Sequence, residues 1–488
     1  MKYIIVTIAL FFSISSLLSQ DNESWFIPAQ VDFSEKISEW DGFGFNYVEA
    51  PQHRDLLENP QDYGGFSLLK EKQKKEIAEM VFGEDGLQVQ LVKMFFDPFH
   101  QKSPNAEFDH ETTTGYMRDF VKRGLQITEQ RNDSIDIITT LYGPPAWATK
   151  QKFVGARDID PSQADNLGDY MVDWVKYLKQ ENFPVKYLSI HNEGEDFYRW
   201  DYEKGTQRLK GFDYNMYWTP DLVNQFLKML PGKLAANGLS SVGVTNGEPS
   251  NWHRFYYWGY AHGLYEDDEA LNNLGLLTSH GFINGDFKRL PYSTANNLTT
   301  DLLRKKNPDL HCWITSFSWG KSGTEFIKTA HEQIYSAKVN GLIPWAGIQH
   351  PDSWIEGDPN PGTAFIVRGE NEYEITPWYY FYKQLTRAGY RGMSVVKALI
   401  ANPVSFIIGF GSNGTEHPDA FVVTSNVYIW GAPFKIEIKG TDAKKFQAYR
   451  TSEDGTEKFK DIGVYEVKDG AIVYDPPKGT TTTFLAVE

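Results

Sequence analysis

Residues Tyr187–Glu193 read YLSIHNE, a short and mostly apolar run that ends in three polar side chains. A helical pattern precedes it over Leu167–Glu181, and another follows over Thr219–Asn237, where Gly238 supplies a stop. A short buried strand between two amphipathic helices is the repeating unit of a parallel α/β fold. The stretch therefore predicts one strand of a sheet that is covered by helices.

The same strand-then-helix unit recurs along the chain. Seven further runs have the character of strands: Gly42–Val48, Leu91–Asp97, Ile135–Gly143, Val242–Gly247, Leu274–His280, Cys312–Ser318 and Leu342–Ile348. Helical patterns separate them, among them Leu68–Phe82, Tyr116–Glu129 and Thr324–Val339. Eight such units predict an α/β fold of the (β/α)8 TIM barrel type, over residues 41–390.

The pattern changes after a last helix at Trp378–Arg387. Short strands separated by turn residues follow: Val404–Gly409, Ala420–Tyr428, Lys435–Lys439, Lys445–Tyr449, Ala471–Tyr474 and Thr482–Val487. This spacing predicts a C-terminal antiparallel β-sandwich domain over residues 391–488. The N-terminal segment, residues 20–40, also alternates from Ala29 to Trp40, and it could donate a strand to that sandwich.

The first residues predict export. Met1–Ser19 has one early charge, Lys2, then an apolar run and a small-residue end, which is the layout of a secretory signal peptide. The run is too short for a confident membrane span, and no later stretch is long enough. We therefore expect a secreted or periplasmic protein without a membrane span.

Composition narrows the choice of partners. The 488 residues carry 48 Lys and Arg against 64 Asp and Glu, a net charge of −16, so no general attraction to nucleic acid is expected. Aromatic residues make up 15% of the chain, which suits either stacking on sugar rings or a large aromatic core. Cys312 is the only cysteine, which excludes an intramolecular disulfide and a cysteine zinc site. No motif calls for a metal or another cofactor.

Catalytic side chains of such a barrel project from the C-terminal ends of its strands. Cleavage of a glycosidic bond needs a proton donor with a raised pKa and a second carboxylate. Asn192-Glu193, at the end of the fourth strand, supplies a donor and a neighbour that could bind a sugar hydroxyl. Other candidates for substrate binding at strand ends are Trp147, His191, Glu195, His280, Ser316, Trp345 and His350.

These residues resemble glycoside hydrolase family 30 and its relatives among the retaining barrels. The resemblance is carried by Gly42–Phe45, Gly143–Trp147, His191-Asn192-Glu193, Trp313-Ile314-Thr315 and the C-terminal sandwich, and it covers nearly the whole mature chain. It implies that Glu193 is the general acid/base, that Asn192 contacts the sugar, and that His280 matches an aromatic or His residue at the sixth strand end.

The chain departs from the family at one critical place. In the family, the tripeptide that matches Trp313-Ile314-Thr315 precedes the nucleophilic Glu, whereas this chain has Ser316. One explanation is that another carboxylate takes over: Glu248, which we favour because Gly247-Glu248-Pro249 breaks the strand, or Glu195 or Asp97. A more distant second carboxylate would leave room for a water and an inverting reaction. Otherwise the chain is an engineered variant, or a carbohydrate-binding barrel without catalysis.

Two loop insertions are expected to build the substrate pocket. They are Asp196–Asp213 and Ser250–Ala270, and both are rich in Trp, Tyr and Arg. Arg199 and Arg254 could hold an anionic sugar, although salt bridges at the rim are the commoner role of such residues. The sequence thus predicts an exported glycoside hydrolase that acts on a poly- or oligosaccharide, with Glu193 and Glu248 as its carboxylates.

Overall fold

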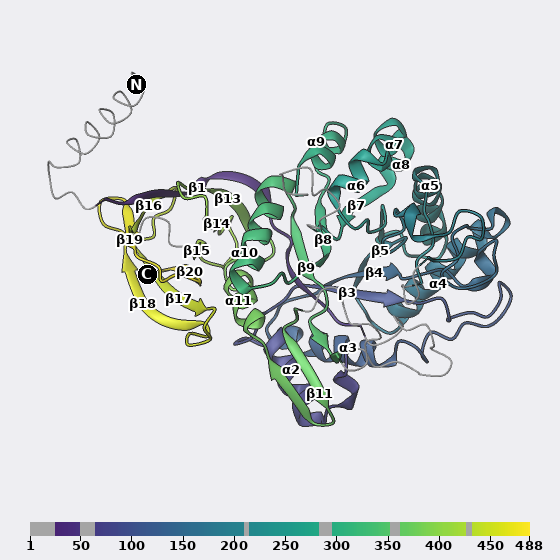
Figure 1. The fold of residues 1–488 in the computed structure, drawn as a ribbon, viewed down its shortest axis with the longest axis horizontal. Coiled ribbons are helices and arrows are strands. Elements are labelled where there is room, and N and C mark those ends of the chain that lie inside the picture. The colour runs from purple at the N-terminus through teal and green to yellow at the C-terminus, as the bar shows by residue number, and fades with distance from the viewer. Residues whose placement is uncertain (1–24, 49–63, 209–213, 283–294, 352–361, 426–431) are drawn as a thin grey trace, which may run out of the picture.

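The computed structural model describes residues 25–48, 64–208, 214–282, 295–351, 362–425 and 432–488. A closed barrel of eight parallel strands lies beside a nine-stranded sheet (Figure 1). The predicted TIM barrel with a β-sandwich domain is confirmed. The predicted signal peptide, Met1–Ser19, lies outside the described residues.

The barrel strands follow one another in chain order, and the last closes on the first. They are β2 (Gly42–Asn46), β3 (Leu91–Phe96), β4 (Asp136–Leu141), β5 (Val185–Ser189), β6 (Gly243–Thr245), β7 (Leu274–Ser279), β8 (Cys312–Phe317) and β9 (Gly341–Pro344). The α-helices are α2 (Glu71–Phe82), α3 (Gly115–Gln130), α4 (Ala164–Gln180), α5 (Pro220–Ala236), α6 (Trp252–Tyr257), α7 (Tyr260–Glu266), α8 (Asp268–Asn273), α9 (Leu298–Arg304), α10 (Gly323–Glu332) and α11 (Pro377–Thr386).

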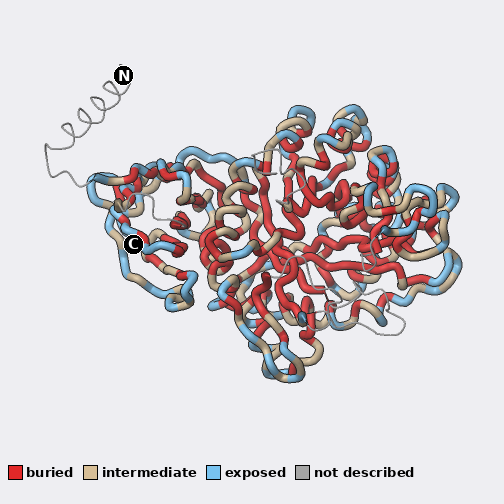
Figure 2. Tube along the Cα trace, viewed as in Figure 1, coloured by how far each residue is buried: buried red, intermediate tan, exposed pale blue. Residues whose placement is uncertain are grey.

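The inside of the barrel changes from apolar to polar along its axis. An apolar layer consists of Leu91, Ile138, Leu276, Trp313 and Ile343, all fully buried. Side chains two residues further along a strand point to the same face. Lys93, Thr140 and Thr315 therefore form a polar layer nearer the C-terminal mouth, where active sites of this fold lie. Figure 2 shows the buried interior of the barrel.

The second domain is the β-sandwich-like one. Its nine strands are hydrogen-bonded in one continuous order, β18-β17-β20-β15-β14-β13-β1-β16-β19. Its strands are β1 (Ile27–Glu39), β13 (Ser394–Ile400), β14 (Ser405–Gly411), β15 (Ala420–Ser425), β16 (Phe434–Lys439), β17 (Lys445–Ser452), β18 (Lys460–Glu466), β19 (Ala471–Tyr474) and β20 (Thr480–Val487). β1 pairs antiparallel with β13 and parallel with β16, and Val31 and Phe33 enter the apolar core of the sheet.

Some elements differ from the sequence prediction. The run Leu342–Ile348 divides into β9 and the short strand β10 (Ile348–Gln349), which pairs with a hairpin of β11 (Phe365–Gly369) and β12 (Glu372–Ile375). The helix expected over Thr324–Val339 is α10, continued by one π-helical turn at Gln333–Ala337. Among the described helices, none is long and apolar enough to cross a membrane.

Candidate active site

Two loops at the mouth of the barrel each carry a carboxylate and are joined by backbone hydrogen bonds. The loop after β5 carries Glu193, and the loop after β6 carries Glu248. The backbone N–H of Glu193 donates to the carbonyl of Glu248 at 2.8 Å, and that of Glu248 donates to the carbonyl of His191 at 2.9 Å. Glu193 has a φ of 40°, an uncommon backbone conformation for a side chain of this size and one that often marks a functional site.

Glu193 has two charged neighbours. One carboxylate oxygen pairs with the Arg199 guanidinium, from the short 3-10 helix Phe197–Arg199. The other lies 2.9 Å from Nδ1 of His280, which follows β7. Burial raises the pKa of Glu193, but Arg199 and His280 lower it by more, so its pKa lies well below the usual range. This is opposite to the raised pKa expected of the proton donor.

The Glu248 carboxylate lies deeper, within the polar layer of the barrel. It is fully buried and accepts hydrogen bonds from Lys93 on β3, Thr140 on β4 and, at 2.8 Å, Thr315 on β8. Nε2 of His280 lies 3.2 Å away. Burial raises the pKa of Glu248, yet Lys93 and His280 lower it by more, so its pKa lies below the usual range.

Ser316 contacts the same lysine. Its Oγ accepts a hydrogen bond from Lys93 Nζ at 3.0 Å and donates one to the carbonyl of Thr315 at 2.7 Å. Burial lowers the pKa of Lys93, while the Glu248 carboxylate opposes that effect. Because Lys93 is paired with Glu248, it is no base for Ser316, and the serine is not an activated nucleophile.

The other two carboxylates considered as replacements hold loops in place. Glu195 accepts hydrogen bonds from the Ser250 backbone at 3.0 Å and from Arg254 at 3.3 Å. Asp97 accepts one from the Phe99 backbone at 2.8 Å and pairs with His100 at 3.2 Å. Glu248 shares a direct neighbour with Glu193, the imidazole of His280.

Four predicted substrate-binding residues have partners of their own within the protein. His191 stacks on Trp218 with ring centroids 5.4 Å apart, and burial lowers its pKa to about 3. The Asn192 side chain donates to Asn215 at 3.3 Å. Trp345 is 8% exposed and lies edge-on to Phe95. Trp147 lies edge-on to Tyr170, and its indole N–H donates to the Gln101 carbonyl at 3.1 Å. Their roles toward a sugar stay predictions.

The remaining candidates lie at the rim. His350 follows β10 and packs against Gly65. Arg199 pairs with Glu193, and Arg254 pairs with Glu195 and Asp196, so both arginines form the salt bridges that are common at a rim. Within the insertion Asp196–Asp213, residues 209–213 lie outside the described part of the chain.

Sequence reasoning missed Lys93, the cation at the centre of the site. It stands in the strand LVKMFF, where every residue is buried. A lysine is almost never fully buried unless it is paired. A lone lysine within an apolar strand is therefore a signal of a buried acidic partner, although the sequence does not say which acid.

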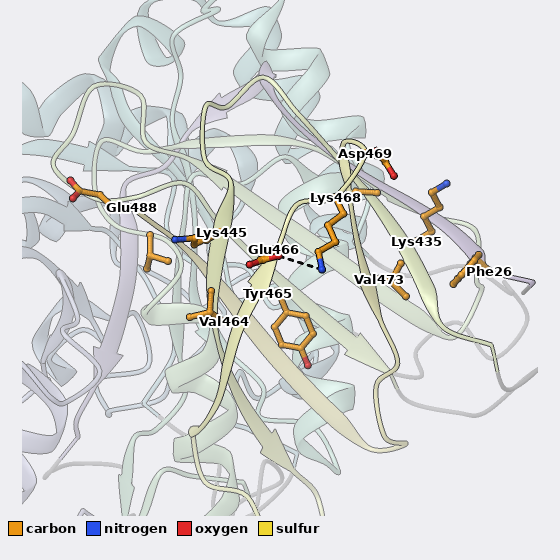
Figure 3. Close-up of a pocket in the computed structure, with 12 residues that line it drawn as sticks. Phe26, Lys435, Lys445, Val464, Tyr465, Glu466, Lys468, Asp469, Val473 and Glu488 are labelled. Atoms are coloured by element: carbon orange, nitrogen blue, oxygen red, sulfur yellow. Dashed lines mark ion pairs between the residues drawn. The ribbon is translucent and has the colours of Figure 1, made fainter.

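The described residues contain no cluster of three or more His, Cys, Asp or Glu side chains that could hold a metal ion. One surface pocket of about 980 Å³ lies on the nine-stranded sheet, between its edge strands β18 and β19 (Figure 3). Its lining includes Tyr465, three valines and a Lys468–Glu466 ion pair, and no lining residue comes from the barrel. The pocket is thus separate from the two carboxylates.

Comparison with solved structures identifies the fold. The catalytic domain of a family 30 xylanase C from Talaromyces cellulolyticus superimposes with a TM-score of 0.70 at 14% identity, covering 94% of this chain and 100% of that one. A family 30 endoxylanase from Clostridium papyrosolvens gives 0.65 at 15%, with the same coverage. An endo-β1,6-glucanase gives 0.66 at 15%, covering 97% and 98%. Neither a protein-family model nor a curated protein sequence matches. The chain therefore shares the fold of family 30 glycoside hydrolases.

Proposed function

We propose that this chain is an exported glycoside hydrolase that cleaves a glycosidic bond of a poly- or oligosaccharide. Glu193 protonates the leaving oxygen, and Glu248 is the second carboxylate. The observation that carries the proposal is that both carboxylates meet at the C-terminal mouth, bound to the two nitrogens of one imidazole, His280. The fold, shared with family 30 xylanases and with a glucanase, supports a carbohydrate substrate.

The spacing of the two carboxylates favours an inverting reaction. An imidazole with hydrogen bonds of 2.9 and 3.2 Å on its two nitrogens separates them. The separation of the two carboxyl groups across this ring therefore exceeds the roughly 5–5.5 Å found in retaining enzymes. It suits the separation of about 6.5–9.5 Å found in inverting enzymes. Lys93 and His280 lower the pKa of Glu248, which favours the ionised form that a general base needs but also makes the carboxylate a weaker base.

A second candidate function is glycan binding without hydrolysis. Serine stands at the position of the family nucleophile, and both carboxylates are paired with cations, Arg199 and Lys93. A site of this kind retains groups that can contact a sugar and lacks a free acid.

The test is product release from a panel of glycans by the native chain, Glu193→Gln and Ser316→Glu. We expect the native chain to release product with inverted anomeric configuration, read by NMR, and Glu193→Gln to lose about 10²-fold or more of the turnover. Glu248→Gln should lose a similar factor, because the water then has no base.

Other outcomes separate the alternatives. If Ser316→Glu alone is active and gives the retained anomer, the native chain is a disabled retaining enzyme. If the native chain and Glu193→Gln bind the same glycan with equal affinity and neither releases product, the binding function replaces the hydrolase.

A further inference from the structure

His280 is placed so that its protonation state is coupled to the protonation states of two neighbouring glutamates. Its Nδ1 lies 2.9 Å from an oxygen of Glu193, and its Nε2 lies 3.2 Å from an oxygen of Glu248. A neutral imidazole donates from one nitrogen and presents a lone pair at the other, whereas an imidazolium donates from both. Two ionised carboxylates therefore require an imidazolium. A neutral ring requires that one carboxyl group carries the proton.

These two arrangements contain the same number of protons. In one, His280 is charged and both glutamates are ionised. In the other, the proton lies on Glu193, which donates it to Nδ1, while Nε2–H still donates to Glu248. The second arrangement is the form that a general acid needs, even though Glu193 by itself is held ionised by Arg199.

We propose that His280 stores the proton that Glu193 delivers to the leaving group, so that Glu193, His280 and Glu248 act as one proton-sharing unit. This inference rests on the proposed hydrolase function. His280 acts through Glu193 and is a positioning residue for the proton, since Glu193 is the group that faces the substrate.

The proton balance of the step is complete. Nδ1 of the His280 imidazolium passes its proton to Glu193, and Glu193 gives that same proton to the glycosidic oxygen as the bond from that oxygen to the anomeric carbon breaks. His280 is then neutral, with its remaining proton on Nε2. The attacking water loses a proton to Glu248 as the new bond to the anomeric carbon forms. As the products leave, Glu248 releases that proton to solvent and Glu193 takes up one from solvent, which restores the shared proton of Glu193 and His280. The full cycle therefore consumes one water molecule and no net proton.

The groups around His280 support this assignment. Lys93 on β3, His191 after β5 and Arg199 are the basic groups near it, and Glu193 and Glu248 are the acids. Only 3% of His280 is exposed, so bulk water has little access to the ring. Burial lowers its pKa, and the hydrogen bonds to the two carboxylates raise it by more, which leaves it above the ordinary value.

The direct test is NMR titration of the whole protein labelled with ¹⁵N in its histidines. The His280 signals are assigned by their loss in His280→Gln, and the exposed His262 on α7 serves as a reference within the same sample. We expect His280 to titrate above an ordinary histidine, and to titrate at lower pH in both Glu193→Gln and Glu248→Gln. A neutral His280 throughout pH 5–8, or one that neither variant changes, would overturn the proposal.

A kinetic test separates proton supply from structure. His280→Gln keeps a polar side chain but cannot store a proton. Its turnover should fall by about 10²-fold on a glycan, and by much less on an aryl glycoside whose leaving group departs without protonation. Equal losses on both substrates would overturn the proposal. If the titration behaves as expected and no glycoside is cleaved, the shared proton stands and the proposed hydrolase function fails.

Discussion

At the scale of single residues, basic and acidic side chains alternate across the site. Arg199 pairs with Glu193, His280 lies between Glu193 and Glu248, and Glu248 pairs with Lys93. Each carboxylate therefore lies between a lysine or arginine on one side and the shared imidazole of His280 on the other. Since charges interact strongly where water is excluded, a change in one member alters the protonation of the next.

Arg199 sets the pH at which Glu193 is protonated. Its guanidinium lowers the pKa of that carboxyl, so Arg199→Gln should raise it and leave more Glu193 protonated at any given pH. The alkaline limb of the pH–rate profile should then move to higher pH in the variant. Arg254→Gln is the matched control, because Arg254 pairs with Glu195 and Asp196. An unchanged limb in Arg199→Gln would contradict the assignment.

Lys93 holds the buried charge of Glu248. Lys93→Met leaves that carboxylate buried without its cation, which should cost about 3–5 kcal/mol in the free energy of unfolding. Adding Glu248→Leu to the same chain should recover most of the loss, because the unpaired charge is removed as well. Urea unfolding measures both. Lys186→Met, which removes an exposed pair with Asp136, should cost about 1 kcal/mol or less. Equal losses of unfolding free energy in Lys93→Met and Lys186→Met would show that Lys93 does not stabilise the buried charge of Glu248.

Single residues also show how far the sequence could lead. Glu193 and Glu248 could be predicted because each follows a barrel strand at its C-terminal end. The pairing of Glu248 with Lys93 could not be predicted, because the two residues are 155 positions apart in the sequence. Only the closed barrel brings β3 near the loop that carries Glu248. The lowered pKa of Glu193 depends on the position of Arg199, which is set by loop geometry.

At the scale of elements, the loops after β5 and β6 depend on a tight backbone turn at Gly247. Its φ is +79°, and a Cβ atom there would lie 2.1 Å from the His191 ring. The turn allows Glu248 to point back into the barrel while its N–H bonds to His191. Glycine is thus required twice, for the conformation and for the close approach of the imidazole.

Gly247→Ala should disturb both loops. The left-handed conformation costs an alanine roughly 1–2 kcal/mol, and displacement of His191 adds to it. Gly238→Ala is a matched control, because Gly238 has a φ of +75° and nothing within 4 Å of the added atom. We expect a larger fall in the unfolding free energy for Gly247→Ala, accompanied by loss of glycan turnover. Equal effects of the two variants would show that the contact with His191 is unimportant.

Strands could be predicted from the sequence where their side chains form a continuous buried run. All eight barrel strands appear within a few residues of their predicted bounds, because strands of a parallel barrel are buried on both faces and form continuous apolar runs. β18 was missed because it lies at the edge of its sheet and reads KDIGVYE, with few buried side chains. β13 was missed although Gly392 before it and Asn402-Pro403 after it are turn signals.

At the scale of the whole molecule, β1 joins the two domains. It lies inside the nine-stranded sheet, between β13 and β16, and the chain then enters the barrel at β2. Trp40 stands between them, 1% exposed, with its ring centroid 4.8 Å from Phe43 of the barrel and 5.5 Å from Phe410 of the sheet. The domains therefore share an apolar contact in addition to the chain connection, which favours joint unfolding.

Trp40→Ala should weaken this coupling. Removal of a buried tryptophan costs about 3–5 kcal/mol, and here the lost contacts are those between the domains. Calorimetry should show one cooperative transition in the native chain and two separated transitions in the variant. Phe33→Ala is the control, because Phe33 lies in the same β1 strand but packs within the sheet, against Phe446. It should lower the stability of the sheet by a similar amount without removing the contact to the barrel. If Trp40→Ala keeps a single transition, the domains are held together by their other contacts, such as the hydrogen bond from Gln384 on α11 to Thr451 on β17.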